Sequence, residues 1–342
     1  MLEQPTRSLY AGIIGHLSAA RKVGEWMFRI SCKLLIRFLL ILLGVSLISF
    51  LLMYLAPGDP AKNMLAAQGI PFTKELLEAK RLEFGFQDPF WVQYGRWLWG
   101  VFQGNLGTTY HSGSSVAKEL AFYFPNTLLL AGSTLFLTLL ISIPLSFIAV
   151  FYKKSPISKV ISIATALANT IPNFVLGIGL MLVFSLYLHL FPIQSTVNLQ
   201  GAVLPSLTLA LTMSSRYIPQ LQEGLTEILE SDAVLGAMGR GLRRGQILRT
   251  TIFPQLVPLL LTLITLSLTS LLGGVAVIEY LFSWPGIGKM LITAVHNRDF
   301  PLIQGSVLVI TASVLLVKTF AEFIQLLINP KRYRKEGSNH VI

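Results

Sequence analysis

The chain has 342 residues, of which 53% are hydrophobic and only 13% are charged, and its mean hydropathy is +0.65. This composition excludes an ordinary soluble domain and predicts an all-α, polytopic membrane protein. The net charge of +11 does not indicate nucleic-acid binding, because the positive side chains flank apolar segments and no RNA- or DNA-binding motif surrounds them. The single cysteine, Cys32, excludes an internal disulfide, and five scattered histidines predict no metal site.

The N-terminal region predicts a retained membrane anchor. Residues 1–33 lack a continuous apolar core and are expected to form a cytoplasmic extension, whereas Leu34–Leu55 is long enough to cross a bilayer. No small-x-small cleavage pattern follows this span ahead of a soluble domain, so we do not expect a cleavable signal.

The next segment, 56–126, is predicted to be an extracytoplasmic loop with interfacial helices. Thr73 can cap a helix that runs to Phe84, and Asp88-Pro89 can start another. The second helix would present a broad aromatic face, which suits the lipid headgroup layer but would also suit contact with a substrate-delivering protein. The residues of that face are Phe90, Trp91, Tyr94, Trp97, Leu98 and Trp99.

A core of five helices is predicted over 127–328, followed by a cytoplasmic tail at 329–342. With the first span, this core gives six transmembrane helices. Prolines inside or beside three of the spans, Pro144, Pro172 and Pro258, predict kinks. The five spans are Thr127–Tyr152, Val160–Leu188, Ala202–Leu221, Gln255–Phe282 and Ile303–Ile328.

Polar residues inside these spans are few, and we expect them to face the bundle interior, because an unpaired polar group in hydrocarbon is costly. They could line a translocation path or simply join neighbouring helices. Lys318 and Glu322 lie four residues apart on the inner half of the last span, where they can pair with each other or reach the membrane surface. The candidates for the path are Asn169, Pro172, Asn173, Ser267 and Ser270.

A polar segment at 223–254 separates two long apolar runs. Its pattern predicts a helix over Glu223–Ala237, a break at Gly239 and Gly241, and a second short helix over Gln246–Phe253. Four arginines gather at this turn, which favours a cytoplasmic location. With both termini also inside, the inner side carries 19 of the 27 Lys and Arg residues and the whole excess of +11.

After the fifth span, the sequence Glu279-Tyr-Leu-Phe-Ser-Trp-Pro-Gly-Ile-Gly predicts a turn and then a short amphipathic helix over Ile287–Val295. The region 283–302 is expected to dip back into the outer vestibule as a re-entrant segment. The residues expected to form this outer gate or turn are Glu279, Trp284, Pro285, Gly286 and Gly288.

The polar segment resembles the coupling loop of ABC importer permeases, whose signature is D-Y-(x)3-A-(x)3-G-L. Asp232, Ala237, Gly241 and Leu242 occupy its positions, although Ala233 replaces the aromatic residue. The outer turn and the segments around Gly104–Gly107 and Pro125–Leu128 also resemble permease subunits of the peptide and nickel class, and the likeness extends from Met27 to Tyr333. The chain is therefore identified as a member of that class, the partner usually given first of two.

The resemblance implies a type I ABC importer permease fold in the bacterial cytoplasmic membrane. It implies a second homologous permease, cytoplasmic ATPase subunits that use ATP and Mg²⁺, and an extracytoplasmic solute-binding protein; the cargo would be a peptide, nickel or a metal chelate. This chain has no P-loop, so we expect it to bind no cofactor itself. The ATPase-coupling loop would comprise Asp232, Ala237, Gly239, Arg240, Gly241 and Leu242.

Two other functional classes are weighed against an importer subunit. A self-contained secondary carrier or channel would need ionisable groups gathered near the membrane midplane from several helices. A membrane enzyme would need a nucleophile and base or a metal centre at membrane depth. The sequence shows neither arrangement, so we expect no catalytic residue and no energy source within this chain.

Overall fold

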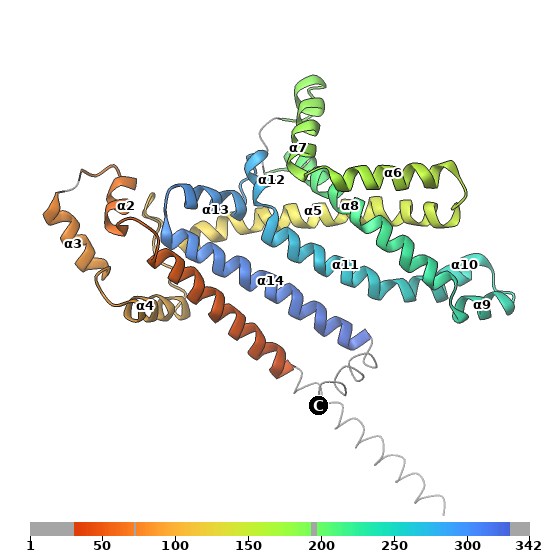
Figure 1. Cartoon of the computed structure of the whole chain (residues 1–342), viewed down its shortest axis with the longest axis horizontal. Helices are drawn as coiled ribbons and strands as arrows, with labels where there is room; N and C mark the ends of the chain where they lie inside the picture. Colours follow the sequence, from red (N-terminus) through yellow and green to blue (C-terminus); the bar gives the residue numbers. More distant parts are fainter. Residues whose placement is uncertain (1–30, 72, 193–196, 329–342) are drawn as a thin grey trace, which may run out of the picture.

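The computed structural model describes residues 31–71, 73–192 and 197–328, and within these ranges the fold is all-α (Figure 1). The exception to helix and turn there is a single antiparallel bridge between Thr108 and Ser115. Most of the expected extension at 1–33, and the whole tail at 329–342, lie outside the described residues.

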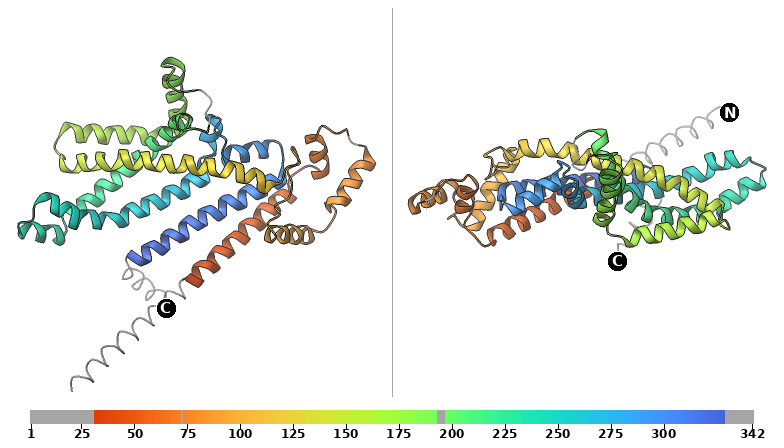
Figure 2. Two further views of the ribbon diagram at one scale, coloured as in Figure 1. Left: turned by 180° about the vertical axis from the view of Figure 1, so that it is seen from behind. Right: turned by 90° about the horizontal axis from the view of Figure 1, so that it is seen from above.

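Five long helices run lengthwise through the molecule: the first helix, Ser31–Tyr54, and then α5 (Val116–Phe151), α8 (Leu199–Leu229), α11 (Phe253–Gly274) and α14 (Phe300–Ile328). Helix α5 packs along α8, and α11 packs along α14. Figures 1 and 2 show the three outer-loop helices gathered at one end of this bundle, while α9 and α10 lie at the opposite end beside the α5–α6 turn.

Four helices among the described residues are long and apolar enough to cross a membrane, or five if one bent pair counts as a single span. They include the first helix, α5, the α10–α11 rod and α14. Six spans therefore remain a prediction. The expected fourth span, Ala202–Leu221, lies in α8, whose many polar residues lower its hydropathy. That helix is central, and Ser206, Thr208 and Ser214 are buried in it.

The expected third span, Val160–Leu188, is not one straight helix. It is divided into α6 (Pro156–Thr170), α7 (Asn173–Met181) and a π-helical turn, η1 (Leu182–Tyr187), and the two halves meet at 104°. Pro172 lacks an N–H group, and Ile171 before it adopts an extended backbone (ψ 124°), so the helix cannot continue. Helix α7 consequently points across the direction of the long helices (Figure 2), while it still packs against α8 and α12. By contrast, α5 continues through Pro144 and α11 through Pro258.

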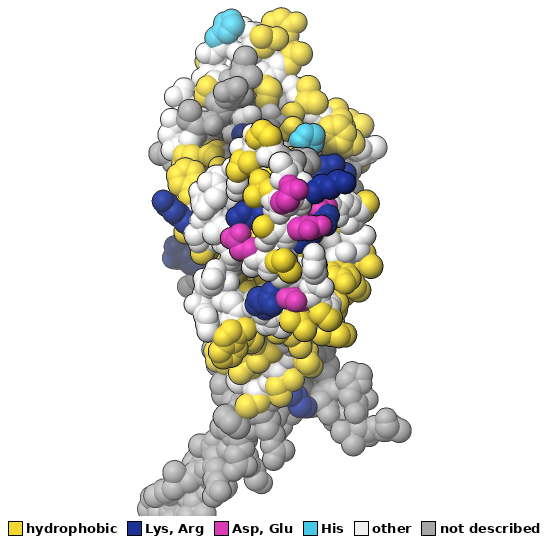
Figure 3. Space-filling view, turned by 90° about the vertical axis from the view of Figure 1, so that its left-hand side faces the viewer, with side chains coloured by type: hydrophobic (Ala, Val, Ile, Leu, Met, Phe, Trp, Pro, Cys, Tyr) yellow, Lys and Arg dark blue, Asp and Glu magenta, His cyan; other side chains and the backbone are white. Residues whose placement is uncertain are grey.

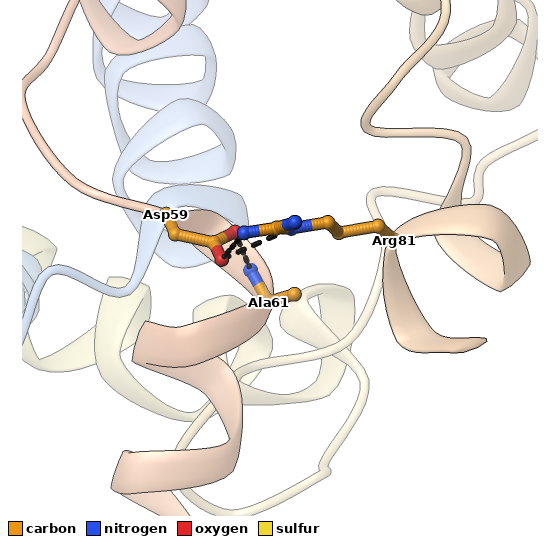
Figure 4. Close-up of polar contacts among 3 residues, drawn as sticks. All are labelled: Asp59, Ala61 and Arg81. Atoms are coloured by element: carbon orange, nitrogen blue, oxygen red, sulfur yellow. Dashed lines mark hydrogen bonds and ion pairs between the residues drawn. The ribbon is translucent and has the colours of Figure 1, made fainter. Parts of the chain in front are cut away.

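The outer end consists of α2 (Pro60–Ala67), α3 (Lys74–Phe84) and α4 (Phe90–Phe102). As predicted, Thr73 caps the second of these, accepting a hydrogen bond from the Leu76 N–H. Asp59 caps α2 through the Ala61 N–H and also binds the Arg81 guanidinium, with oxygen–nitrogen distances of 2.7 and 3.1 Å (Figure 4). Acidic and basic side chains alternate over this end (Figure 3), consistent with the balanced charge expected for the outer side.

The aromatic face of α4 is divided between two environments. Tyr94 is buried, packs on Phe50 of the first helix and forms a hydrogen bond with the Ser46 hydroxyl (2.9 Å). Trp91 and Trp99 remain exposed. Part of this face therefore holds the outer loop on the first helix, and the other part is available to lipid or to a partner.

A charged contact joins the first helix and α14 near the ends that the charge pattern predicts to face the cytoplasm. Arg37 pairs with Glu322 at 2.5 Å, so the carboxylate has its partner on another helix and not at Lys318, four residues earlier. The spacing allowed Lys318 and Glu322 either to pair or to reach the membrane surface. Glu322 instead pairs with a guanidinium from the first helix, whose planar fork suits a carboxylate better than an ammonium group does.

Candidate coupling segment and outer turn

The predicted coupling segment forms a compact projection at the end of the bundle opposite α2–α4 (Figure 1). It contains α9 (Asp232–Gly239), α10 (Arg244–Ile247) and a π-helical turn, η2 (Leu248–Ile252), which leads directly into α11. The expected helix over Glu223–Ala237 is interrupted, because α8 ends at Leu229 and Ser231 adopts the extended conformation of an N-cap. The second helix also begins earlier than predicted, at Arg244.

Gly241 forms the turn after α9. Its φ of +75° lies in the left-handed region, its N–H donates to the Met238 carbonyl, and the Leu242 N–H donates to the Ala237 carbonyl. These two bonds form a Schellman motif, which satisfies carbonyls at the helix end and favours glycine at this position. The predicted break is confirmed at Gly241, whereas Gly239 is the last residue of α9.

One face of the segment is fixed to the bundle. Val234 and Ala237 are completely buried, and they share an apolar core with Ile252, with Leu225 of α8 and with Leu256 of α11. Ala237, which the resemblance assigns to the coupling loop, holds that loop on the bundle in this structure. The segment is therefore a rigid extension of α8 and α11 and not a loose connector.

The opposite face of the segment is open. Leu235 and Met238 are 55% and 53% exposed, and both are apolar side chains at the tip of the molecule. Exposed apolar side chains on a projection of this kind are typical of a protein-binding surface. Leu235 and Met238 were not among the predicted coupling residues; the predicted ones that are exposed are Asp232, Gly239, Arg240, Gly241 and Leu242.

The outer turn is built around Glu279, which lies in α12 (Ala276–Leu281) and is completely buried. The Thr127 hydroxyl donates to its carboxylate at 2.7 Å, and the Lys289 N–H donates to the second oxygen at 3.1 Å. Thr127 in turn accepts from the Ile287 N–H at 2.9 Å. This chain of bonds connects α5, α12 and α13 (Ile287–His296) and satisfies every buried group in it.

The remaining outer-turn residues complete the same cluster. Trp284 is completely buried and donates its indole N–H to the Asn126 carbonyl, while the Asn126 side chain donates to the Pro285 carbonyl at 2.7 Å. A Cβ atom at Gly286 would overlap the Glu279 carboxylate, and one at Gly288 would overlap Ala276. The structure thus brings all five predicted residues together, as a tightly packed joint, and α13 confirms the predicted short helix.

Sequence reasoning did not identify Asn126 as part of this joint, nor a second buried carboxylate nearby. Asp299 is 2% exposed, accepts hydrogen bonds from the Tyr110 N–H (2.9 Å) and the Leu302 N–H (3.3 Å), and so connects the loop before α5 to the start of α14. Burial raises the pKa of Asp299, although its hydrogen bonds oppose that shift; burial likewise raises the pKa of the Tyr110 hydroxyl. Arg298, the residue before Asp299, has a left-handed backbone, but this feature is visible in the structure and not in the sequence.

The candidate path residues do not form one cluster. Ser267 is buried and bonds to the Tyr217 hydroxyl on α8, whereas Ser270 is exposed. Asn169 accepts from the Arg216 guanidinium at 3.4 Å, next to the break at Pro172, and Asn173 begins α7. Among the described residues, no three His, Cys, Asp or Glu side chains lie close enough to hold a metal ion.

Comparison with known proteins places most of the chain in a family. Residues 142–334 match the family described as binding-protein-dependent transport system inner membrane component, and residues 27–131 match the family described as the N-terminal part of the membrane component of such systems. The chain is 35% identical over 307 residues to the nickel import system permease protein NikB of Staphylococcus aureus (strain bovine RF122 / ET3-1), covering 89% of this chain and 92% of that protein. The NikB protein of strain MRSA252 is 36% identical over the same length.

The fold also has a counterpart among solved structures. A chain of the MetNI methionine ABC transporter, in an inward-facing conformation, superimposes with a TM-score of 0.52 at 17% identity, covering 61% of this chain and 95% of that one. This likeness concerns the fold and agrees with the predicted type I permease architecture. The chain belongs to the binding-protein-dependent transport system inner membrane components, and it is a transmembrane permease subunit of an ABC importer, of the peptide/nickel class predicted from its sequence.

Proposed function

We propose that this subunit moves nickel, free or as a small chelate, across the bacterial cytoplasmic membrane after a solute-binding protein delivers it. The named nickel permeases among its relatives support this cargo above a peptide. The subunit would work with a second, homologous permease. Its termini and coupling segment would face the cytoplasm, because membrane proteins carry their excess of Lys and Arg on that side.

We propose that the energy comes from separate ATPase subunits that bind ATP and Mg²⁺, and that this chain binds neither and catalyses no reaction. The observation that carries the proposal is the two-sided coupling segment. Its apolar core joins it to α8 and α11, while Leu235 and Met238 are exposed at its tip. A force applied to the exposed face would therefore move both long helices together, which is a physical route between the two sites.

The experiment measures whether the tagged chain captures the ATPase from solubilised membranes of cells that express the whole transport operon. Leu235→Asp with Met238→Asp should abolish capture, because charged groups would replace the apolar contact, whereas Leu82→Asp on the equally exposed surface of α3 should capture normally. Reconstituted wild-type complexes should import radioactive Ni²⁺ only with ATP and the solute-binding protein. Normal capture by the double variant would contradict the coupling assignment, and uptake without ATP would indicate a self-contained carrier.

A further inference from the structure

The inner half of α8 has a polar face that no other described element covers. Arg216, Gln220, Glu223 and Glu227 are exposed and follow one another at helical spacing, on the face opposite the buried Tyr217, Leu221 and Leu225. A helix face with this many charges cannot lie against lipid tails. It therefore faces water or a protein partner when the subunit is in the membrane.

Arg216 is exposed, but it lies far along α8 from the end of that helix at Leu229. The rise from Leu229, at the end of α8 beside the coupling segment, to Arg216 is roughly 20 Å at 1.5 Å per residue. Its hydrogen-bond partner Asn169 lies roughly the same distance from Pro156, at the inner end of α6. With the membrane surface placed at these two helix ends, a hydrocarbon core about 30 Å thick would put the guanidinium nearer the middle of the membrane than its surface.

No carboxylate of the described chain neutralises this guanidinium. The ion pairs found there involve Arg37, Lys80, Arg81 and Arg96, and the hydrogen bond from Arg216 goes to the neutral Asn169 side chain. An arginine at membrane depth without a counter-charge faces a water-filled cavity or a protein partner, and it favours an anion there.

The backbone beside Arg216 supports the same conclusion. Helix α6 ends at Thr170 and the chain bends by 104° before α7, one residue beyond the Asn169 side chain. Interrupted helices at membrane depth occur where the backbone is buried in protein or lines a cavity, and they commonly mark transport sites. Two features therefore lie at the same place: a guanidinium that forms no ion pair within the described residues, and the break between α6 and α7.

We propose that Arg216 binds a carboxylate group of the cargo in the translocation path, and that Asn169 orients its guanidinium. A guanidinium presents parallel N–H donors that match the two oxygens of a carboxylate. The inference rests on the proposed function, and it narrows the cargo to anionic or zwitterionic molecules such as nickel held by an amino-acid chelator. A lipid phosphate is the competing anion, and it would place this face of α8 against the bilayer.

The first test uses thiol labelling in reconstituted complexes whose subunit carries Cys32→Ser. Gln220→Cys, one turn from Arg216, should react with a water-soluble methanethiosulfonate applied from the ATPase side, whereas Leu40→Cys on the exposed apolar face of the first helix should not. Equal resistance at both positions would overturn the proposal, because the face of α8 would then lie against lipid.

The second test measures the electric field of Arg216 itself. At Gln220→Cys, the ratio of labelling rates for an anionic and a cationic methanethiosulfonate should fall on the order of tenfold when Arg216→Gln is added. Arg216→Lys, which keeps the charge, should preserve the ratio. A ratio unchanged by Arg216→Gln would show that the guanidinium does not attract anions into the path.

The third test compares two probes loaded on the solute-binding protein, Ni²⁺ with L-histidine and Ni²⁺ with L-histidinamide, after its affinity for each has been measured. Arg216→Gln should reduce uptake of the carboxylate-bearing chelate about tenfold and leave the amide chelate nearly unchanged. Equal losses would indicate a structural role and contradict the proposal. If the wild-type complex imports neither probe, the nickel assignment fails, and the labelling ratio still decides whether Arg216 attracts anions.

Discussion

The coupling segment and the outer turn both depend on glycine, for opposite reasons. Gly241 has open space where a side chain would begin, and its requirement is the left-handed backbone. Gly288 has an ordinary φ, and its requirement is space, because a Cβ atom would lie 2.7 Å from the Ala276 Cβ. The outer turn is therefore a packed joint that holds helices together, whereas the coupling segment is an exposed projection whose shape is set by one backbone angle.

This difference predicts which substitutions prevent folding of the subunit and which abolish only its transport activity. A substitution in the packed joint acts on every contact around Glu279, so folding and assembly suffer first. A substitution at the exposed turn changes the direction of a few residues while the anchors Val234 and Ala237 stay buried. Transport should then fail in a protein that still inserts.

The largest effect is expected for Gly288→Ala. The added methyl would overlap the backbone of α12 and crowd Glu279, and overpacking of this kind costs on the order of 1–3 kcal/mol or more. The amount of folded subunit in membranes should fall strongly, as measured by fluorescence-detected size exclusion. Gly132→Ala on α5, where no atom lies within 4 Å of the new Cβ, is the matched control. Equal yields of the two variants would show that the joint is not tightly packed.

Gly241→Val should insert normally but fail to transport. A β-branched residue at a φ of +75° is strained by about 1–3 kcal/mol, so the turn would change its backbone and redirect Leu242. Gly241→Asn is the control, because asparagine tolerates the left-handed region. ATPase stimulation by the loaded solute-binding protein, together with uptake, measures the effect. Wild-type uptake in the valine variant would reduce this segment to a plain connector.

Thr127→Val should have a smaller effect, confined to stability. The variant keeps the shape of the side chain but removes the donor to Glu279 and leaves the Ile287 N–H unpaired in a buried place, which costs about 1–3 kcal/mol. The thermal midpoint of the detergent-solubilised complex should fall, whereas Thr127→Ser should remain near wild type. A midpoint unaffected by valine would mean that water replaces the hydroxyl.

The sequence predicted the features that depend on neighbouring residues along the chain. Apolar length indicated the membrane bundle, Thr73 predicted the start of α3, and Gly241 predicted the turn after α9. Ser231 followed by Asp232 is also a local helix-start signal, and it could have placed the break between α8 and α9.

The features that sequence missed depend on tertiary contacts. Pro172 signalled that a helix hydrogen bond is lost, but a bend of 104° follows from how α7 meets its neighbours. Glu279 and Thr127 are 152 residues apart, so nothing local pairs them. The sequence did not indicate the polar face of α8, because its polar residues are scattered among apolar ones. They form one surface only because the helix continues to Leu229.

The smallest expected effect is on the pH dependence of stability, and it concerns Asp299, which lies outside the joint around Glu279. Burial raises the pKa of Asp299 in the folded protein above its unfolded value, so the folded state binds a proton more tightly and the stability from this group is lost as pH rises through the folded pKa. Asp299→Asn cannot titrate. The thermal midpoint of wild type relative to this variant should therefore decline modestly from about pH 4 towards neutral pH. A relative midpoint that rises with pH would mean that the hydrogen bonds from Tyr110, His111 and Leu302 outweigh desolvation, and that Asp299 holds the loop to α14 as a stabilised anion.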